Sequence, residues 1–123
     1  MANPRHLLGW QGEDAAAAWL DAIGWTILAR RWRTAHGELD LVCRDPDAVL
    51  VGVEVRLRRG SRTGSALASV DRRRIGRLRA TLGAYAASHG AAVPAGLRID
   101  LVTVTPTTDG RWRLARHPAV DAW

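Results

Sequence analysis

The order of predicted elements along this 123-residue chain indicates an α/β sandwich with a mixed central sheet. A helical pattern opens the chain, three strand-like segments follow it, and a second helical pattern precedes a fourth strand. The valine-rich alternation of residues 49–57 and the nearly continuous apolar run at 101–104 are typical of strands that helices cover. The length predicts one domain, residues 1–123, with a core that needs no disulfide or metal to hold it.

The first helix is expected at about residues 7–23, with Gly24 ending it. On a helical wheel Glu13 falls inside the apolar arc, whereas Asp14 and Asp21 lie on the polar side. A helix acid that faces the core is uncommon. Two interpretations stay open: Glu13 pairs with an arginine at the helix margin, or it points toward acids of the sheet.

Residues 25–33 are expected to form the first strand, and Gly37 lets the chain turn into the second. Period-two alternation then divides the side chains of the next two strands between two faces. In the second strand Glu38, Asp40, Val42 and Arg44 share one face and Leu39, Leu41 and Cys43 the other; in the third, Leu50, Gly52, Glu54 and Arg56 share one face and Val49, Val51, Val53, Val55 and Leu57 the other. The only cysteine is therefore expected to be a buried core thiol.

Glu54 is an acid in the middle of a valine-rich strand, and burial of a lone carboxylate is costly. We therefore expect a metal ion or another cation beside it. If the turn at residues 45–48 closes a tight hairpin in an even register, Asp40 lies about opposite Glu54, with the two Cβ atoms roughly 5 Å apart. An odd register would place the two acids on opposite faces and break the site.

A Gly/Ser/Arg segment follows the third strand and carries Arg58, Arg59 and Arg62. We expect it to be an exposed loop that is either a plain linker or a clamp on a phosphate backbone. After the second helix, residues 97–105 read as a strand and residues 112–116 as a short edge strand.

The second helix is expected at residues 71–89, with Ser69 or Asp71 as its N-cap. Arg74 lies at the margin of its apolar face, where it can reach a groove, whereas Arg77 points away from that face. The apolar stripe comprises Ile75, Leu78, Leu82, Tyr85 and Ala86.

The chain carries 18 basic residues against 12 acidic ones, a net charge of +6, and every basic residue is arginine. This balance favours a polyanionic partner, with a solvated surface as the alternative. The guanidinium fork suits phosphate. No apolar run is long enough to span a membrane and the start does not resemble a secretion signal, so we expect a cytoplasmic protein without a membrane partner. The four histidines lack metal-ligand spacing, and only His36 merits testing as a site residue.

Several segments resemble a known family over nearly the whole chain. They are GEDAAAAWLDAIGWTILARRWR, GELDLV, VGVEVR, VDRRRIGRL, RIDLV and HPAVDAW, and together they resemble the YraN family of small bacterial proteins, which is similar to archaeal Holliday-junction resolvases. Glu13, Asp40 and Glu54-x-Arg56 also resemble the Asp…(Glu/Asp)-x-Lys signature of restriction-endonuclease-like nucleases. The resemblance implies a restriction-endonuclease-like αβββαβ sandwich with a mixed central sheet.

The same resemblance implies hydrolysis of phosphodiesters with Mg²⁺ or Mn²⁺ as the cofactor. Asp40 and Glu54 would supply carboxylate ligands and Val55 its carbonyl oxygen. Glu13 would act through water or help to hold a second ion. Glu38 shares the predicted face of Asp40 and is the rival ligand.

Position 56 departs from the family pattern, which places lysine there. Arginine is not deprotonated in a protein, so Arg56 would steady the phosphate electrostatically and not accept a proton. Gly52 stands where the family tends to have a bulky apolar residue, and we expect it to make room for the longer guanidinium. Arg74 likewise stands at a family lysine.

The leading hypothesis is a Mg²⁺-dependent endonuclease that cuts DNA, including branched DNA. The alternative is a nucleic-acid-binding module that keeps the acids with little or no turnover. A third reading is an interaction protein in which Glu13 and Glu54 simply pair with Arg56 and Arg74.

Nucleic acid is the expected partner, DNA in preference to RNA. The residues expected to contact it are Arg58, Arg59, Arg62 and Arg74. Resolvase-like enzymes work in pairs, so a homodimer through an exposed Trp112 or Trp123 is a further expectation.

Overall fold

The computed structural model describes residues 4–58, 71–89 and 95–122, with side chains placed from residue 9 onward. Its elements are α1 (Pro4–Ala22), β1 (Thr26–Thr34), β2 (Gly37–Arg44), β3 (Leu50–Leu57), α3 (Arg72–Ser88), β4 (Leu97–Pro106), β5 (Trp112–His117) and the short 3₁₀ helix η1 (Val120–Ala122). Each predicted helix and strand is present, with ends displaced by a few residues at most.

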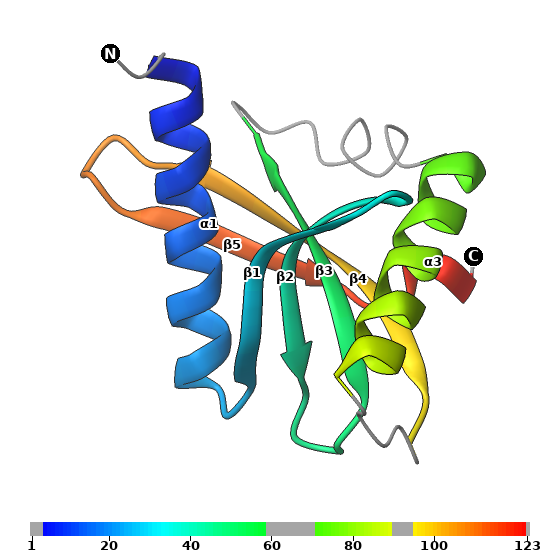
Figure 1. The fold of residues 1–123 in the computed structure, drawn as a ribbon. Helices are drawn as coiled ribbons and strands as arrows, with labels where there is room; N and C mark the ends of the chain where they lie inside the picture. Colours follow the sequence, from blue (N-terminus) through cyan, green and yellow to red (C-terminus); the bar gives the residue numbers. More distant parts are fainter. Residues whose placement is uncertain (1–3, 59–70, 90–94, 123) are drawn as a thin grey trace.

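The five strands form one sheet in the order β1-β2-β3-β4-β5. Neighbouring strands are antiparallel except β3 and β4, which are parallel and are joined through α3. Helix α1 lies against one face of the sheet and α3 against the other (Figure 1). The predicted fold class, a restriction-endonuclease-like α/β sandwich with a mixed sheet, is confirmed.

The α1 side of the sheet holds one half of the core. Ala16 and Leu20 of α1 are fully buried against the valines of β3 and β4. Gly12 permits this close packing, because a Cβ atom at that position would lie 2.8 Å from Cγ2 of Val104. Cys43 is buried on the same side, as predicted, and burial raises the pKa of its thiol to about 12.

The α3 side holds the other half. The Asp71 carboxylate accepts a hydrogen bond from the Arg74 N–H at 2.8 Å and so caps the first turn of α3. Leu78, Leu82 and Tyr85 are then buried against the sheet. Tyr85 belongs to the core, as its position in the apolar stripe predicted.

A two-residue turn joins β1 to β2, with Thr34 paired to Gly37 across the hairpin. The Thr34 hydroxyl accepts a hydrogen bond from the His36 N–H at 3.0 Å, which fixes the turn. Gly37 has φ 149°, a conformation that side chains with a Cβ rarely adopt. This hairpin tip therefore holds a defined shape beside α3.

One feature of β2 differs from the prediction. Leu39, Leu41 and Cys43 were expected on one face, but only Leu41 and Cys43 lie in the α1-side core, whereas Leu39 packs in the α3-side core. The alternation therefore breaks at Asp40. On the neighbouring strand Arg31, which stands opposite this point, has φ 49°, so the backbone is irregular on both strands.

Trp112 was expected to be exposed, but it is half-buried against the α1-side core. Trp123 lies outside the described residues. None of the helices in the described ranges is long and apolar enough to cross a membrane.

Candidate functional site

The hairpin of β2 and β3 has the even register on which the predicted site depends. Leu41 pairs with Val53 and Arg44 with Leu50. One further step in this register brings Asp40 opposite Glu54. From the sequence this register was only a condition for the site, with the odd register as the alternative, and the pairing meets the condition.

The backbone ladder between the two strands ends just before Asp40. At the next position the Val55 N–H donates to Oδ2 of the Asp40 carboxylate, at 2.7 Å. A side-chain oxygen thus takes the place of a main-chain acceptor, which satisfies the backbone while the strands separate. At this separation β2 also changes the face of the sheet on which its alternate side chains lie.

The Asp40 carboxyl group is held in a setting that disfavours its charge. Burial, followed by the negative charge of Glu54, raises the pKa of Asp40 to about 8, and Glu13 adds a smaller effect in the same direction. The hydrogen bond from Val55 acts the other way. In the absence of a compensating cation, the Asp40 carboxyl group therefore keeps its proton near neutral pH.

Glu54 is buried, with 5% of its side chain exposed. Its Oε1 accepts a hydrogen bond from the Arg74 guanidinium at 2.8 Å, and Nε of Arg56 lies 3.8 Å from the same oxygen. Its Oε2 has no hydrogen-bond partner in the described structure, and neither do the Nε atoms of Arg56 and Arg74. An orphaned buried carboxylate oxygen needs an explanation, and a ligand that binds there supplies one.

Glu13 faces inward from α1, as the helical wheel predicted, and only 14% of its side chain is exposed. Its Oε2 accepts a hydrogen bond from Nε of Arg31 at 2.7 Å. Of the two interpretations that the sequence left open, pairing with an arginine at the helix margin therefore holds. Glu13 is still near enough to raise the pKa of Asp40, so both interpretations describe part of its environment.

Glu38, the rival ligand, does not belong to this group. Its carboxylate accepts a hydrogen bond from Nε of Arg33 at 2.7 Å on the β1–β2 hairpin. Asp40 is the acid of β2 that meets Glu54.

The residues present fit a divalent cation with few protein ligands. Among the described residues no three His, Cys, Asp or Glu side chains gather closely enough to hold a metal ion by themselves. The Asp40–Glu54 pair, with one orphaned oxygen and a raised carboxyl pKa, offers two carboxylate ligands, and Val55 adjoins them in β3. Mg²⁺ commonly binds through one or two carboxylates and keeps several waters, so such a site suits it.

Gly52 does not make room for Arg56, contrary to the prediction. A Cβ atom at Gly52 would lie 3.0 Å from both Ile99 Cδ1 and Leu39 Cδ2. The space above Gly52 is thus filled by the side chains of Ile99 and of Leu39, which turns toward α3. Arg56 is accommodated elsewhere, with 31% of its side chain exposed.

The predicted nucleic-acid contacts have different outcomes. Arg58 was expected in an exposed loop but is buried, 7% exposed, and its N–H donates to the carbonyl of Val104 at 2.8 Å, which extends β3 beside β4. Arg59 and Arg62 lie outside the described residues. Arg74 reaches both Glu54 and a surface pocket, so its position at the helix margin was predicted correctly.

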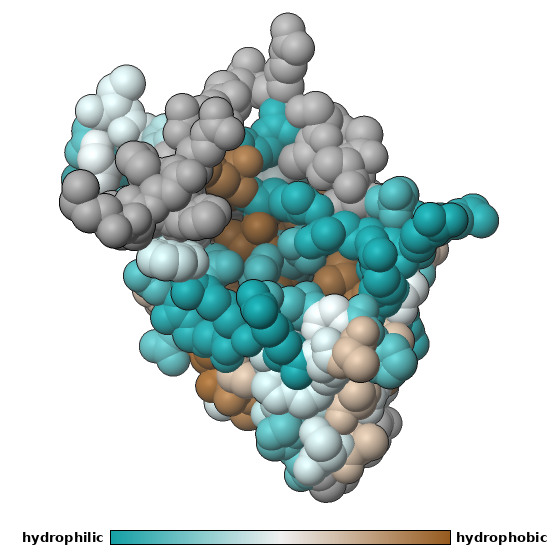
Figure 2. All heavy atoms as spheres, turned by 45° about the horizontal axis from the view of Figure 1, so that its top comes forward, coloured by the Kyte–Doolittle hydropathy of each residue, from teal (hydrophilic) through white to brown (hydrophobic). Residues whose placement is uncertain are grey.

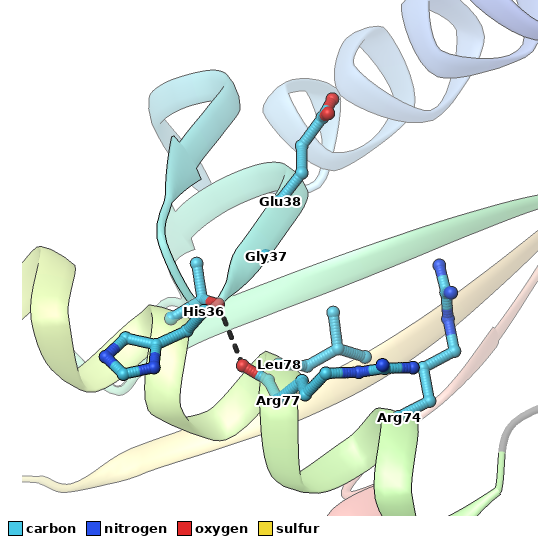
Figure 3. Close-up of a pocket in the computed structure, with 7 residues that line it drawn as sticks. His36, Gly37, Glu38, Arg74, Arg77 and Leu78 are labelled. Carbon is cyan, nitrogen blue, oxygen red and sulfur yellow. Dashed lines mark hydrogen bonds between the residues drawn. The ribbon is translucent and has the colours of Figure 1, made fainter.

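That pocket contains two further cationic or titratable residues, of which the sequence had indicated only His36 as worth testing. Arg77 and His36 line it together with Arg74 (Figure 3). Because Arg77 lies outside the apolar stripe, the helical wheel indicated only that its side chain points away from the core. The hairpin tip packs against α3 and therefore lies beside Arg77. Seen from the end of the molecule at the top of Figure 1, hydrophilic residues gather around a recess in which hydrophobic atoms are visible (Figure 2).

A second buried acid provides a contrast. Asp100 is fully buried, and its two oxygens accept hydrogen bonds from Arg98, Arg116 and the Ala119 N–H at 2.8–3.0 Å. Both Asp100 oxygens are satisfied, whereas one oxygen of Glu54 is not. Asp100 is therefore a structural residue. No local pattern in the sequence indicated this network, because the groups that bind Asp100 come from separate segments.

Comparison with known proteins identifies relatives over most of the chain. The family described as "Uncharacterised protein family UPF0102" matches residues 12–104. The UPF0102 protein of Streptomyces coelicolor is 44% identical to this chain, over 83% of this chain and 78% of its own length. The UPF0102 protein of Methylococcus capsulatus is also 44% identical, over 86% of this chain and 84% of its own length. One from Anaeromyxobacter dehalogenans is 44% identical over 94% of this chain and 84% of its own. The matched region contains Glu13, Asp40, Glu54 and Arg74, and the chain belongs to the UPF0102 family, which is the YraN family of the sequence analysis.

Proposed function

We propose that this protein binds nucleic acid and hydrolyses its phosphodiester bonds with a divalent cation, Mg²⁺ or Mn²⁺, with DNA as the first substrate to test. The observation that carries the proposal is the Asp40–Glu54 pair at the point where β2 and β3 separate. One carboxyl group there has a pKa of about 8 and the other has an orphaned buried oxygen. Two guanidinium groups lie beside them.

The electrostatics of the pair support a cation. Two carboxylates that meet in a buried setting do not both ionise unless a positive charge compensates them. Arg74 compensates only one oxygen of Glu54, and the raised pKa of Asp40 indicates that the remaining negative charge is not neutralised. A divalent ion bound there would polarise a phosphoryl oxygen and lower the pKa of a bound water.

The chain's own residues would then position the substrate. Arg74 holds Oε1 of Glu54, which leaves Oε2 free for a ligand, and the Val55 N–H fixes the orientation of the Asp40 carboxylate. The Arg56 guanidinium stays charged, so it stabilises negative charge on a phosphate and does not act as a base. Glu13, held by Arg31, would orient water near Asp40.

A binding module with little turnover is the second candidate, and a specific observation favours it. Glu54 pairs with Arg74 and lies near Arg56, so part of its charge is already compensated by arginines. Because Arg56 stands where nucleases of this superfamily have a lysine, a group that can exchange protons is missing beside the acids. This candidate keeps nucleic-acid binding and loses the chemistry.

Cleavage assays on fluorescently labelled duplex, flap and four-way-junction DNA with Mn²⁺ separate the two candidates. For a nuclease, we expect metal-dependent cleavage that Asp40→Asn and Glu54→Gln each reduce by at least about a hundredfold, since each removes a charged ligand. Asp14→Asn is the matched control, because Asp14 is an exposed acid of α1. DNA binding without cleavage by the wild-type protein would support the module.

The variant Arg56→Lys tests why turnover would be weak. A lysine at this position can lower its pKa and exchange a proton, so we expect faster cleavage than in the wild-type protein, by roughly tenfold or more. If Arg56→Lys folds and binds Mn²⁺ yet remains inert, the nuclease proposal fails and the module is favoured.

A further inference from the structure

A cavity of about 260 Å³ lies between the tip of the β1–β2 hairpin and the first half of α3. His36, Gly37 and Glu38 form its hairpin wall, and Arg74, Arg77, Leu78 and Thr81 form its helix wall (Figure 3). The Thr81 hydroxyl donates to the Arg77 carbonyl at 2.8 Å, so it is already used within the helix. The groups that remain for a ligand are the side chains of Arg74 and Arg77, because the His36 ring points away from both of them (Figure 3).

The charge of this cavity is positive. Arg74 and Arg77 are one helical turn apart, and the Arg77 side chain extends along the helix toward Arg74 (Figure 3). Neither the Arg77 guanidinium nor the His36 ring has a hydrogen-bond or ion-pair partner among the described residues. Two arginines held side by side repel each other, and an anion between them removes this repulsion.

The one acid of the cavity does not cancel this charge. Glu38 turns its carboxylate away from Arg74 and Arg77 (Figure 3) and binds Nε of Arg33 at 2.7 Å. An anion that enters the cavity therefore meets the two guanidinium groups, whereas the Glu38 carboxylate and the His36 ring are directed elsewhere (Figure 3).

The cavity is connected to the acids through one side chain. Arg74 lines the cavity and also donates to Oε1 of Glu54 at 2.8 Å. A phosphate in the cavity and a phosphate at the Asp40–Glu54 pair would thus lie on the two sides of the same guanidinium. A nucleic-acid strand presents phosphates at short, regular intervals and can occupy both places at once.

We propose that the cavity lined by Arg74 and Arg77 is a second phosphate-binding subsite, which holds the phosphodiester next to the one at the acids on the same nucleic-acid strand. The inference rests on the proposed function, because it places the strand relative to the Asp40–Glu54 pair. It assigns a ligand contact to Arg77, which lines the cavity because the hairpin tip packs against α3. Arg77 contributes the strongest contact, since its guanidinium is not engaged by an acid.

The test is the affinity of labelled single-stranded DNA, measured by fluorescence anisotropy with Ca²⁺ at several salt concentrations. For Arg77→Ala we expect affinity to fall about five- to tenfold, and the slope of log K against log[salt] to become shallower by about one unit. His36→Ala should leave the affinity nearly unchanged, because the His36 ring points away from both guanidinium groups (Figure 3). Arg73→Ala is the matched control, because it removes an exposed arginine from the same helix that does not line the cavity.

The proposed function and this inference fail in different ways. Equal losses in Arg77→Ala and Arg73→Ala would overturn the subsite, because net charge alone would then explain the effect. Competition by inorganic phosphate at the same concentration in wild type and Arg77→Ala would also count against it. Mn²⁺ binding, measured in parallel, should be unchanged in Arg77→Ala. If the wild-type protein binds neither Mn²⁺ nor DNA, the proposed function itself is wrong.

Discussion

Asp40 shows how one residue joins the fold to the proposed chemistry. Its Oδ2 accepts the Val55 N–H, so the carboxyl group helps to close the sheet at the point where the ladder ends. Burial and the charge of Glu54 nevertheless raise its pKa to about 8. A carboxyl group that the fold needs as an acceptor, but not as a charge, reduces stability when it ionises. Such a cost is typical of a functional residue.

The raised pKa predicts how stability depends on pH. In the folded protein Asp40 keeps its proton up to about pH 8, whereas in the unfolded chain it loses the proton near its ordinary pKa of 3.8. The folded state therefore binds more protons between these values, and this contribution to the free energy of unfolding decreases as pH rises. We expect Asp40 to account for a loss on the order of 1–3 kcal/mol between pH 5 and pH 8 in metal-free protein.

Urea unfolding of the wild-type protein and of Asp40→Asn at several pH values measures this contribution. An amide keeps an acceptor for Val55 and carries no charge, so the variant should be the more stable protein at pH 8 and its excess stability should shrink toward pH 5. A difference that stays constant with pH would show that the charge of Asp40 is not the cause.

At the scale of elements, the site depends on how β2 changes face. Leu39 turns toward α3 and occupies the space above Gly52, while Leu41 turns toward α1. Asp40 lies between these two leucines and is thereby brought to the place where β2 leaves β3. The absence of a side chain at Gly52 thus makes room for Leu39 and permits the change of face. It does not serve to accommodate the larger side chain of Arg56.

Gly52→Ala tests this role. The added Cβ would meet Ile99 and Leu39 at 3.0 Å, so we expect a loss of about 1–3 kcal/mol in the free energy of unfolding. Gly76→Ala is the matched control on α3, where nothing lies within 4 Å of a new Cβ, and it should stabilise the protein by about 0.5–1 kcal/mol. Thermal or urea unfolding of both variants compares them. Equal effects at the two positions would contradict the packing described for Leu39.

At the scale of the whole molecule, much of the architecture follows from local patterns. The period-two alternation of β3 and the N-cap at Asp71 predicted the strand and the second helix. The pairing of Asp40 with Glu54 was expected only if the hairpin had the even register, and the structure has that register. The change of face at Leu39, the burial of Arg58 and the position of Arg77 beside His36 depend on packing between distant segments, and no local pattern in the sequence carries that information.

The hydrogen-bond network around Asp100 stabilises the β4–β5 side of the sheet. It links β4 to β5 through Arg116 and to the C-terminal segment through the Ala119 N–H. Asp100→Asn would leave Arg116 without its charged partner and Arg98 with Asp45 alone, so we expect a loss of about 3–5 kcal/mol. This is opposite in sign to the effect of Asp40→Asn at pH 8, and chemical unfolding of the two variants side by side checks it. A stable Asp100→Asn protein would show that the network is not structural.

The central claim is that the Asp40–Glu54 pair binds a divalent cation, and titration calorimetry with Mn²⁺ at pH 8 tests it most directly. We predict binding that is lost in both Asp40→Asn and Glu54→Gln and kept in Asp14→Asn, with an affinity that falls as pH is lowered toward 5 because Asp40 takes up a proton. Absence of Mn²⁺ binding by the folded wild-type protein, or binding that Asp40→Asn leaves unchanged, would contradict the claim.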